Sequence, residues 1–390
     1  MGLFRASVRR EIRRFGHTPV LVVSAIVIPV VMTLLYVAMF WRGTVHDLPV
    51  AVWDGDHSAL SRQIVRMVDA TPSVEVVLQV EGIDQGRRAM VRGEVDALIV
   101  IPPGLQAEVM GGRGGGQVAA EISGARILNS GLLKRDLTTV FQALNIGLET
   151  QMLGARGLPA RAGHPMAYPV AFDKHVLFNP YGSYAYYLLP GLLYLALVIT
   201  VSVVTVYVVG SELKYGTAGE WVETAGGSVT RALAAKLAPY VLLFGLLSLF
   251  MNTILYRFMG LPFHGQEAMI LVAGNLFVIL AYMAMSVMLV AATANMRLSM
   301  SIAGGLATAS LSLCGLTFPA VGMYPGIVAL AKLFPFTYFI DLFIEQSLRG
   351  APPARALGDL AALGVFVLAM GLFIPRLRRV ATDEKYYGRY

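Results

Sequence analysis

Long runs of apolar residues without a charged side chain dominate the pattern of this chain. A helix needs about 20 such residues to cross about 30 Å of hydrocarbon. Six runs approach or exceed this length, and we expect each to contain one membrane-spanning helix: Pro19–Phe40, Tyr181–Ser211, Leu237–Tyr256, Ala268–Met296, Leu298–Ala331 and Leu360–Pro375. The fifth run is long enough for a span and an additional re-entrant piece. The pattern therefore predicts a membrane α-helical protein with six transmembrane helices.

Residues 1–17 precede the first run and combine apolar and basic side chains at helical spacing. The apolar residues fall on one face of a helix and the arginines on the opposite one: Leu3, Phe4, Val8 and Ile12. This pattern is typical of an interfacial helix at the level of the lipid headgroups; a solvated basic tail is the alternative. We expect residues 18–42 to form the first span, because the run is too long for a cleaved signal peptide.

A polar segment, residues 43–178, separates the first two runs and is expected to form a small extracytoplasmic α/β domain. Four short stretches within it have the pattern of β-strands: Pro49–Trp53, Val74–Val80, Asp96–Ile101 and Val118–Ile122. Helical patterns lie between them, and a long helix over Ile127–Leu153 follows. A turn-rich return over Pro159–Pro169 then leads to the second run. Alternation of strands and helices predicts an α/β fold.

Charged residues make up only 14% of the chain, against about a quarter in soluble domains. The net charge of +7 comes from lysines and arginines beside the apolar runs, so it does not indicate a nucleic-acid partner. Arginines cluster at residues 5–14, before the first run, and at residues 376–379, after the last. Because cytoplasmic segments are enriched in Lys and Arg, we expect both termini, including the tail 377–390, in the cytoplasm. Residues 179–376 then hold the second to sixth spans.

Sequence motifs for catalysis or metal binding are not found. The glycine cluster at residues 111–116 lacks the Lys-Ser/Thr pair of a phosphate-binding loop, and Asp54–His57 lacks the further ligands of a calcium loop. We therefore expect no catalytic residue, no metal and no cofactor on this chain. The expected spans hold almost no ionisable side chains, which argues against a carrier driven by protons or sodium.

The segment 211–231 places charged and small residues between the second and third runs: Glu212, Lys214, Gly216, Thr217 and Glu220. Glycine beside threonine permits a tight turn, and Trp221 is expected to anchor the segment at the membrane interface. One interpretation is a solvated loop that ends one span and begins the next. The other is a short, rigid amphipathic helix on which a soluble cytoplasmic motor docks.

Residues 318–352 are too polar to cross a membrane and too apolar for an ordinary loop. Prolines and bulky apolar residues interrupt this outer segment: Phe318, Pro319, Met323, Pro325 and Pro335. We expect re-entrant half-helices that dip into the outer leaflet, because irregular backbone at membrane depth must be covered by protein.

Three groups of residues, in this order, resemble the membrane subunit of type-2 ATP-binding-cassette (ABC) exporters of the drug and lipid export kind. The first group lies between the second and third runs: Glu212, Lys214, Gly216-Thr217, Glu220, Lys236 and Pro239-Tyr240. The second and third groups lie in the outer segment: Phe318-Pro319 with Met323 and Pro325, then Phe334–Phe339 with Leu348–Ala351. The chain departs from the family pattern at Gly219, where the family has a glutamate, and at Ala225 and Ala235.

This resemblance implies a permease that pairs with a second permease chain, identical or related, and with two nucleotide-binding subunits that hold ATP and magnesium. ATP binding would move the interfacial helix, through Arg9 and Arg13, together with the segment 211–231. Alternating access would then export drug-like or lipid-like amphipathic substrates across a bacterial inner membrane, with a periplasmic adaptor as a further expected partner. Spans two and five would line the dimer interface, where small residues allow close packing: Gly304, Gly305, Ala307 and Ala309.

A membrane protein that senses a ligand or has a structural role, without transport, is the alternative function. Such a protein needs no ATPase partner. Co-purification with an ATPase subunit therefore distinguishes the two hypotheses.

Overall fold

The structure is a computed structural model that describes residues 2–111, 116–155, 177–180, 182–263, 265 and 268–388. These residues divide into two compact units: a helical unit, Met1–Gly43 with Leu177–Tyr390, and an α/β unit, Thr44–Val176. The expected return over Pro159–Pro169 and most of the glycine cluster at 111–116 lie outside the described residues.

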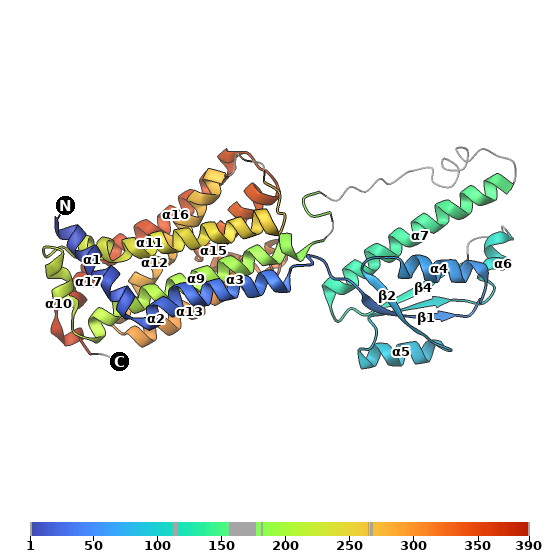
Figure 1. The fold of residues 1–390 in the computed structure, drawn as a ribbon, viewed down its shortest axis with the longest axis horizontal. Helices are drawn as coiled ribbons and strands as arrows, with labels where there is room; N and C mark the ends of the chain where they lie inside the picture. The colour runs from blue at the N-terminus through green and yellow to red at the C-terminus, as the bar shows by residue number, and fades with distance from the viewer. Residues whose placement is uncertain are drawn as a thin grey trace. The chain divides into compact units, whose positions relative to one another are not determined.

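The α/β unit contains a four-stranded sheet in the order β2-β1-β3-β4. Its strands confirm the four stretches predicted from the alternation: β1 Leu48–Asp54, β2 Val74–Gln79, β3 Ala97–Ile101 and β4 Ala119–Ile122. The first three are parallel, and β4 is antiparallel to β3 (Figure 1). The helices of the unit are α4 Ala59–Asp69, α5 Ile83–Arg92, α6 Leu105–Met110 and α7 Ile127–Ala155.

Helices cover both faces of this sheet. One apolar cluster joins β1, β2 and β3 to α4, α6 and α7, and a second joins the opposite face to α5. Burial on both faces explains why β3 is a continuous apolar run rather than an alternating one. The α/β fold predicted for this segment is present; the side of the membrane on which it lies stays a prediction.

The helical unit begins with α1 Gly2–His17, which is followed by a continuous helix over residues 19–39. Its other long helices are α9 Tyr184–Lys214, α11 Val229–Thr253 with η3 Ile254–Phe258, α12 Ala268–Thr293 and α13 Met296–Leu313. Shorter helices are α10 Ala218–Thr224, α14 Pro325–Ala331, α15 Pro335–Phe343 and η5 Ile344–Leu348. The chain then forms α16 Ala356–Ala369, η7 Met370–Phe373 and α17 Ile374–Thr382.

Five of the described helices are long and apolar enough to cross a membrane: residues 19–39, 184–214, 229–258, 268–293 and 353–382. The pair formed by α14 and α15–η5 is bent by 88°, as a broken span or a re-entrant loop is. The expected fifth span is shorter than its apolar run, because α13 ends at Leu313 and Gly315 then adopts a positive φ of 86°. The total of six spans stays a prediction.

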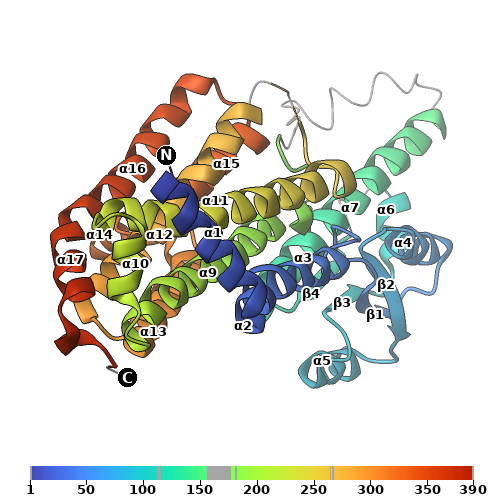
Figure 2. The ribbon, with the colours of Figure 1, turned by 60° about the vertical axis from the view of Figure 1, so that its left-hand side comes forward.

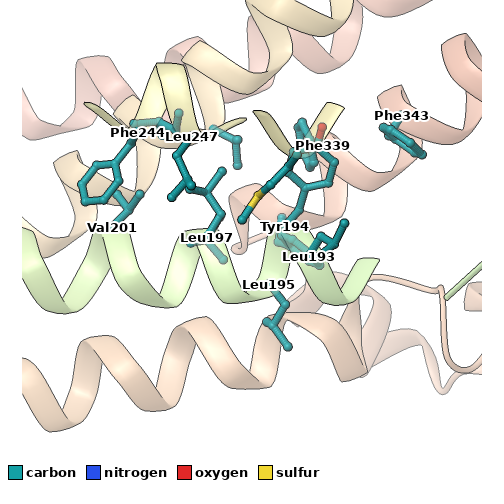
Figure 3. Packing of buried hydrophobic residues seen from close by; sticks show 14 of the residues in the cluster. Leu193, Tyr194, Leu195, Leu197, Val201, Phe244, Leu247, Phe339 and Phe343 are labelled. Atoms are coloured by element: carbon teal, nitrogen blue, oxygen red, sulfur yellow. The ribbon is translucent and has the colours of Figure 1, made fainter. Parts of the chain in front are cut away.

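Helix α9 is at the centre of the helical unit, with α11, α12, α13 and α3 (Ile28–Met39, the second half of the helix over residues 19–39) packed against it. Figure 3 shows Tyr194, Leu197 and Val201 of α9 facing Phe244 and Leu247 of α11, with Phe339 of α15 beside Tyr194. The Tyr194 and Phe339 rings meet edge to face, 4.6 Å between centroids. Figure 2 shows α1 running alongside α11, near α10. The helices α1, α10 and α17 therefore gather at one end of the unit, where the functional candidates of the segment 211–231 lie.

Candidate functional site

Two glycine turns bound the short helix α10. Helix α9 ends at Lys214, and Gly216 follows with a φ of 71°, a left-handed conformation that glycine adopts without strain. Gly226 and Gly227 form the second turn, and the Ser228 side chain then caps α11 by accepting a hydrogen bond from the Arg231 amide. The turn and the short helix predicted for the segment 211–231 are both confirmed.

The inner face of α10 is packed into the protein. Ala218, Trp221 and Val222 are buried among residues of α9, α11 and α17. Trp221 is only 2% exposed, and its Nε1 donates a hydrogen bond to the carbonyl oxygen of Ala232, 3.2 Å away. The prediction of an interface anchor at Trp221 is therefore wrong: the indole attaches α10 to α11 instead.

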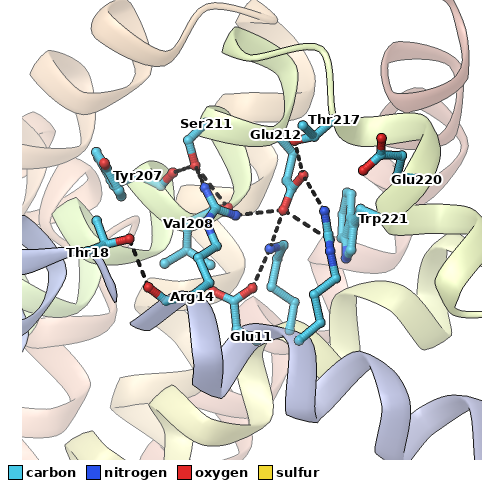
Figure 4. Close-up of polar contacts among 12 residues, drawn as sticks. Glu11, Arg14, Thr18, Tyr207, Val208, Ser211, Glu212, Thr217, Glu220 and Trp221 are labelled. Carbon is cyan, nitrogen blue, oxygen red and sulfur yellow. Dashed lines mark hydrogen bonds and ion pairs between the residues drawn. The ribbon is translucent and has the colours of Figure 1, made fainter. Parts of the chain in front are cut away.

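Glu212 lies beneath this helix, fully buried, at the centre of a cluster of cations (Figure 4). Its Oε1 is 2.7 Å from Lys236 Nζ and 2.6 Å from Arg14 Nη1. Arg10 is also within reach, with its Nη1 3.3 Å from the same oxygen. The Thr217 hydroxyl donates to the second carboxylate oxygen. One carboxylate thus connects α1, α9, α11 and the turn before α10.

Glu11 of α1 completes the cluster from the other side. Its carboxylate accepts hydrogen bonds from Lys236 Nζ at 2.6 Å and from the Tyr240 hydroxyl at 2.9 Å. Glu11 and Lys236 are 2% and 1% exposed, and Lys236 Nζ also lies 5.4 Å from the centre of the Trp221 ring. Lys236 therefore bridges two carboxylates that lie 201 positions apart in the chain. We refer to Glu11, Glu212, Lys236, Arg10 and Arg14 as the buried ion network.

Three cations face two carboxylates in this network, so both carboxylates are compensated and one positive charge is left over. Burying charges is costly, and removing one partner from a buried pair costs about 3–5 kcal/mol because the other charge is left uncompensated. Arg10 and Arg14 retain side-chain exposures of 30% and 23%, so they stay partly hydrated. The network thus makes α1 a fixed part of the helical unit rather than a loosely attached tail.

Helix α1 carries three kinds of surface rather than the two faces predicted. Ser7 and Glu11 are buried, so a polar stripe faces the helical unit. Exposed apolar residues lie on both sides of this polar stripe: Leu3 on one side, Phe4 and Ile12 on the other. Arg5, Arg9 and Arg13 form the third, an exposed stripe. The position of this helix in the lipid headgroups stays a prediction.

The residues predicted for coupling differ in their environments. Glu212 is buried, so it is not available for direct contact with a partner, whereas Glu220 is exposed on α10. Lys214 is half-buried beside the Tyr215 ring, and Arg9 and Arg13 are exposed on α1. The arginines that reach Glu212 are their neighbours, Arg10 and Arg14, which the sequence analysis did not select. Glu11 was not predicted either, although a single acidic residue within an arginine-rich helix is a signal of a buried ion pair.

The residues that were predicted to be functional in the outer segment do not belong to the buried ion network. Pro325 and Pro335 each occupy the first turn of a helix, where the missing amide is not needed. Phe318, Pro319 and Pro325 are exposed and Met323 is half-buried, whereas Pro335 is buried at the start of the aromatic helix α15. Within the described residues, no group of three or more His, Cys, Asp or Glu side chains is arranged to hold a metal ion.

Comparison with known protein families gives one match. The profile of a family described as ABC-2 family transporter protein matches residues 19–374, which is most of the chain. No curated protein matches the chain. The matched range contains Glu212, Lys236 and the outer segment, and it begins directly after α1.

Proposed function

We propose that this chain exports amphipathic or lipophilic substrates. It belongs to the ABC-2 transporter family and is therefore the membrane permease of an ABC transporter. The family is a transport component rather than a catalytic subunit, and it associates with ABC ATP-binding subunits. Outward transport, alternating access, drug-like or lipid-like substrates and a bacterial inner membrane are the proposed details. Cytoplasmic termini and ATP-magnesium on the partner subunits complete the proposal.

The buried ion network is the observation that supports a coupling role. A force on the exposed side of α1 or on α10 reaches α9 and α11 through ionic contacts of 2.6–2.7 Å and not through a flexible loop. Because α9 is the central helix of the unit, its displacement moves the helices packed on it. In this mechanism Glu220 on α10 contacts the ATPase, α1 moves together with α9, and Glu212 transmits the motion without touching the ATPase.

A second permease chain has a suitable surface on α13. Ala303, Ala307 and Ser310 face inward, whereas Gly305 and Ala309 are exposed, with nothing within 4 Å of a Cβ built on Gly305. Small exposed residues allow close helix approach in membranes. We assign Gly305 and Ala309 to the interface of a homodimer or heterodimer. Ala307, which the resemblance placed there, faces the interior of its own chain.

The decisive experiment reconstitutes the chain in lipid vesicles with and without its ATP-binding subunit and follows efflux of a lipophilic fluorescent dye. We expect dye transport only with the subunit and ATP. Glu220→Ala is expected to lower transport per ATP hydrolysed at unchanged thermal stability. Glu75→Ala, which removes an exposed acidic residue of the α/β unit, is the matched control.

Two results would contradict this proposal. Dye transport by the isolated chain without ATP excludes an ABC mechanism for it. A chain that binds no ATP-binding subunit, and moves no dye with one, fits the alternative of a ligand-sensing or structural membrane protein. A periplasmic adaptor is tested separately, by adding candidate adaptors to the same vesicles.

A further inference from the structure

An apolar groove runs between α1 and α11 on the side of α1 next to its basic stripe. Its volume is about 240 Å³. Its rims are the side chains of Ile12 and Phe15 on α1 and of Leu242, Leu243 and Leu246 on α11. Glu11 and Tyr240 form part of its wall, so the groove reaches the buried ion network.

The groove has the character of a site for a hydrocarbon chain. Pockets for drug-sized ligands measure about 300–1,000 Å³, so this smaller space suits a narrow apolar group. Ile12 and Leu242 on its rims are 56% and 66% exposed, which leaves it open along one side. The rings of Phe15 and Tyr240, which both line the groove, meet edge to face with 5.8 Å between their centroids. Among the described residues that line the groove, Glu11 alone is charged, and its carboxylate already binds Lys236 and Tyr240.

The basic stripe of α1 supplies the second observation. Arg5, Arg9 and Arg13 are exposed, and in the described part of the chain no carboxylate lies within ion-pair distance of them. Residues three or four apart lie side by side on a helix, so Arg9 neighbours Ile12 at the rim of the groove. Basic side chains of this kind attract anionic lipid headgroups. An apolar groove and a free cationic stripe therefore meet along one helix.

We propose that this groove holds one acyl chain of an anionic phospholipid whose headgroup is bound by Arg5, Arg9 and Arg13. The chain covers the apolar side of Glu11 and Tyr240, which keeps water away from the Glu11–Lys236 pair. It also fills the space between α1 and α11. The lipid is thus a structural partner of the buried ion network, distinct from any transported substrate.

Lipid retention tests the site without reference to transport. The full chain is purified from vesicles containing equal amounts of phosphatidylglycerol and phosphatidylcholine, which share the same acyl chains, and bound lipid is measured by native mass spectrometry. We expect preferential retention of phosphatidylglycerol. Leu243→Trp, which fills the groove, is expected to reduce retention at least fivefold. Leu276→Trp, at an exposed position on α12 that does not line the groove, is the matched control and is expected to retain lipid as the wild type does.

The triple substitution Arg5→Gln, Arg9→Gln and Arg13→Gln separates the contribution of the lipid headgroup to binding from that of the acyl chain. It is expected to abolish the preference for phosphatidylglycerol while leaving some phosphatidylcholine bound. Equal retention of the two lipids by the wild type, or unchanged retention in Leu243→Trp, overturns the proposal. Saturation of the site by glycerol phosphate also overturns the proposal, because this molecule has no acyl chain to fill the groove.

One consequence rests on the proposed function: with the ATP-binding subunit present, phosphatidylglycerol should raise dye transport per ATP relative to phosphatidylcholine alone. Leu243→Trp should lose this increase and Leu276→Trp should keep it. A chain that retains phosphatidylglycerol as expected but transports nothing would contradict the transport function and leave the lipid site standing. A chain that transports dye but retains the two lipids equally would contradict the lipid site and leave the transport function standing.

Discussion

The two units of this protein both contain ion pairs of similar geometry in different surroundings. In the helical unit, Arg14 lies 2.6 Å from Glu212, whose side chain is fully buried. In the α/β unit, Arg92 lies 2.7 Å from Glu94, and both side chains are more than half exposed. Arg87 and Glu121 form a similar pair at the surface, between α5 and β4. The atomic distances alone would rank these pairs as equals.

Burial separates them. Water screens an exposed pair and solvates each partner when the pair breaks, so such pairs contribute little to stability. In the buried ion network, losing one partner leaves a buried charge less compensated, and water cannot fully replace that partner. The helical unit therefore depends on its buried charges, whereas the α/β unit depends on its two apolar clusters and its sheet. Four substitutions test this comparison, in order of decreasing effect.

Lys236→Met should have the largest effect, because it removes the bridge between Glu11 and Glu212. We expect a loss of about 3–5 kcal/mol in the free energy of unfolding, seen as early loss of the monodisperse peak when the protein is heated in detergent. Lys385→Met, at a cation near the C-terminus that is 62% exposed, is the control. Equal stability of the two variants would show that the network is dispensable.

Glu212→Gln should have the second largest effect. The amide keeps the shape of the side chain but removes the carboxylate that Arg10 and Arg14 contact, while Lys236 keeps Glu11. Because the two arginines can turn toward water, we expect a smaller loss, about 1–3 kcal/mol. Transport per ATP should also fall, since α1 is less firmly held to α9. A loss as large as that of Lys236→Met would mean that the arginines are less free than their exposure indicates.

Asp56→Asn probes a carboxylate of intermediate exposure in the α/β unit. Asp56 accepts hydrogen bonds from the amides of Gly104 at 2.8 Å and Gln106 at 3.1 Å. Burial acts to raise the pKa of Asp56, but hydrogen bonds from Ser58 and from the Gln106 and Gly104 amides together hold it below the ordinary 3.8. We expect a loss of about 0.5–1.5 kcal/mol at pH 7, read from hydrogen exchange across residues 48–110.

The pH dependence of that loss has a definite sign. A lowered pKa in the folded state stabilises the fold above pH 3.8 and loses this contribution as the pH falls through the folded value. The stabilities of the wild type and Asp56→Asn should therefore converge below pH 3.8. A difference that stayed constant down to that range would assign the effect to packing instead of charge.

Glu121→Gln should have the smallest effect. The Arg87 guanidinium holds the pKa of Glu121 below its ordinary value, so the pair stabilises the fold only above that range and the contribution is lost on acidification. Because the pair is exposed, we expect an unfolding midpoint indistinguishable from that of the wild type at physiological salt. A clear drop in the unfolding midpoint would mean that this surface pair contributes to stability much as the buried ion network does, which would contradict the comparison.

Much of the secondary structure followed from the sequence, because periodicity and apolar length are local properties. The strands of the α/β unit, the helix before the first span and the turn at Gly216 were all predicted. The boundaries of the third span were less accurate: the charge-free run begins at Leu237, whereas α11 begins at Val229 and includes Arg231 and Lys236. A charged residue ends an apolar run in the sequence, but in the structure Lys236 stays inside the helix because two carboxylates neutralise it.

The fifth span shows the opposite error. A continuous apolar run from Leu298 to Ala331 predicts a long span, but the chain leaves the helix at Leu313 and turns at Gly315. The following prolines begin new, short helices because proline fits the first turn of a helix and not its interior. Apolar length alone does not distinguish one span from a span with a bent pair after it.

Apolar runs, the strand–helix alternation and the ordered motifs determined the membrane class, the α/β unit and the resemblance to ABC permeases that the family match then confirmed. The tertiary structure alone decided which charges meet. Glu11 and Lys236 are 225 positions apart, and Arg14 and Glu212 are 198 apart, so no local pattern records their contact. Neighbouring arginines on α1 look equivalent in the sequence; the rotation of that helix against α11 buries Glu11, directs Arg10 and Arg14 to Glu212, and leaves Arg9 and Arg13 exposed.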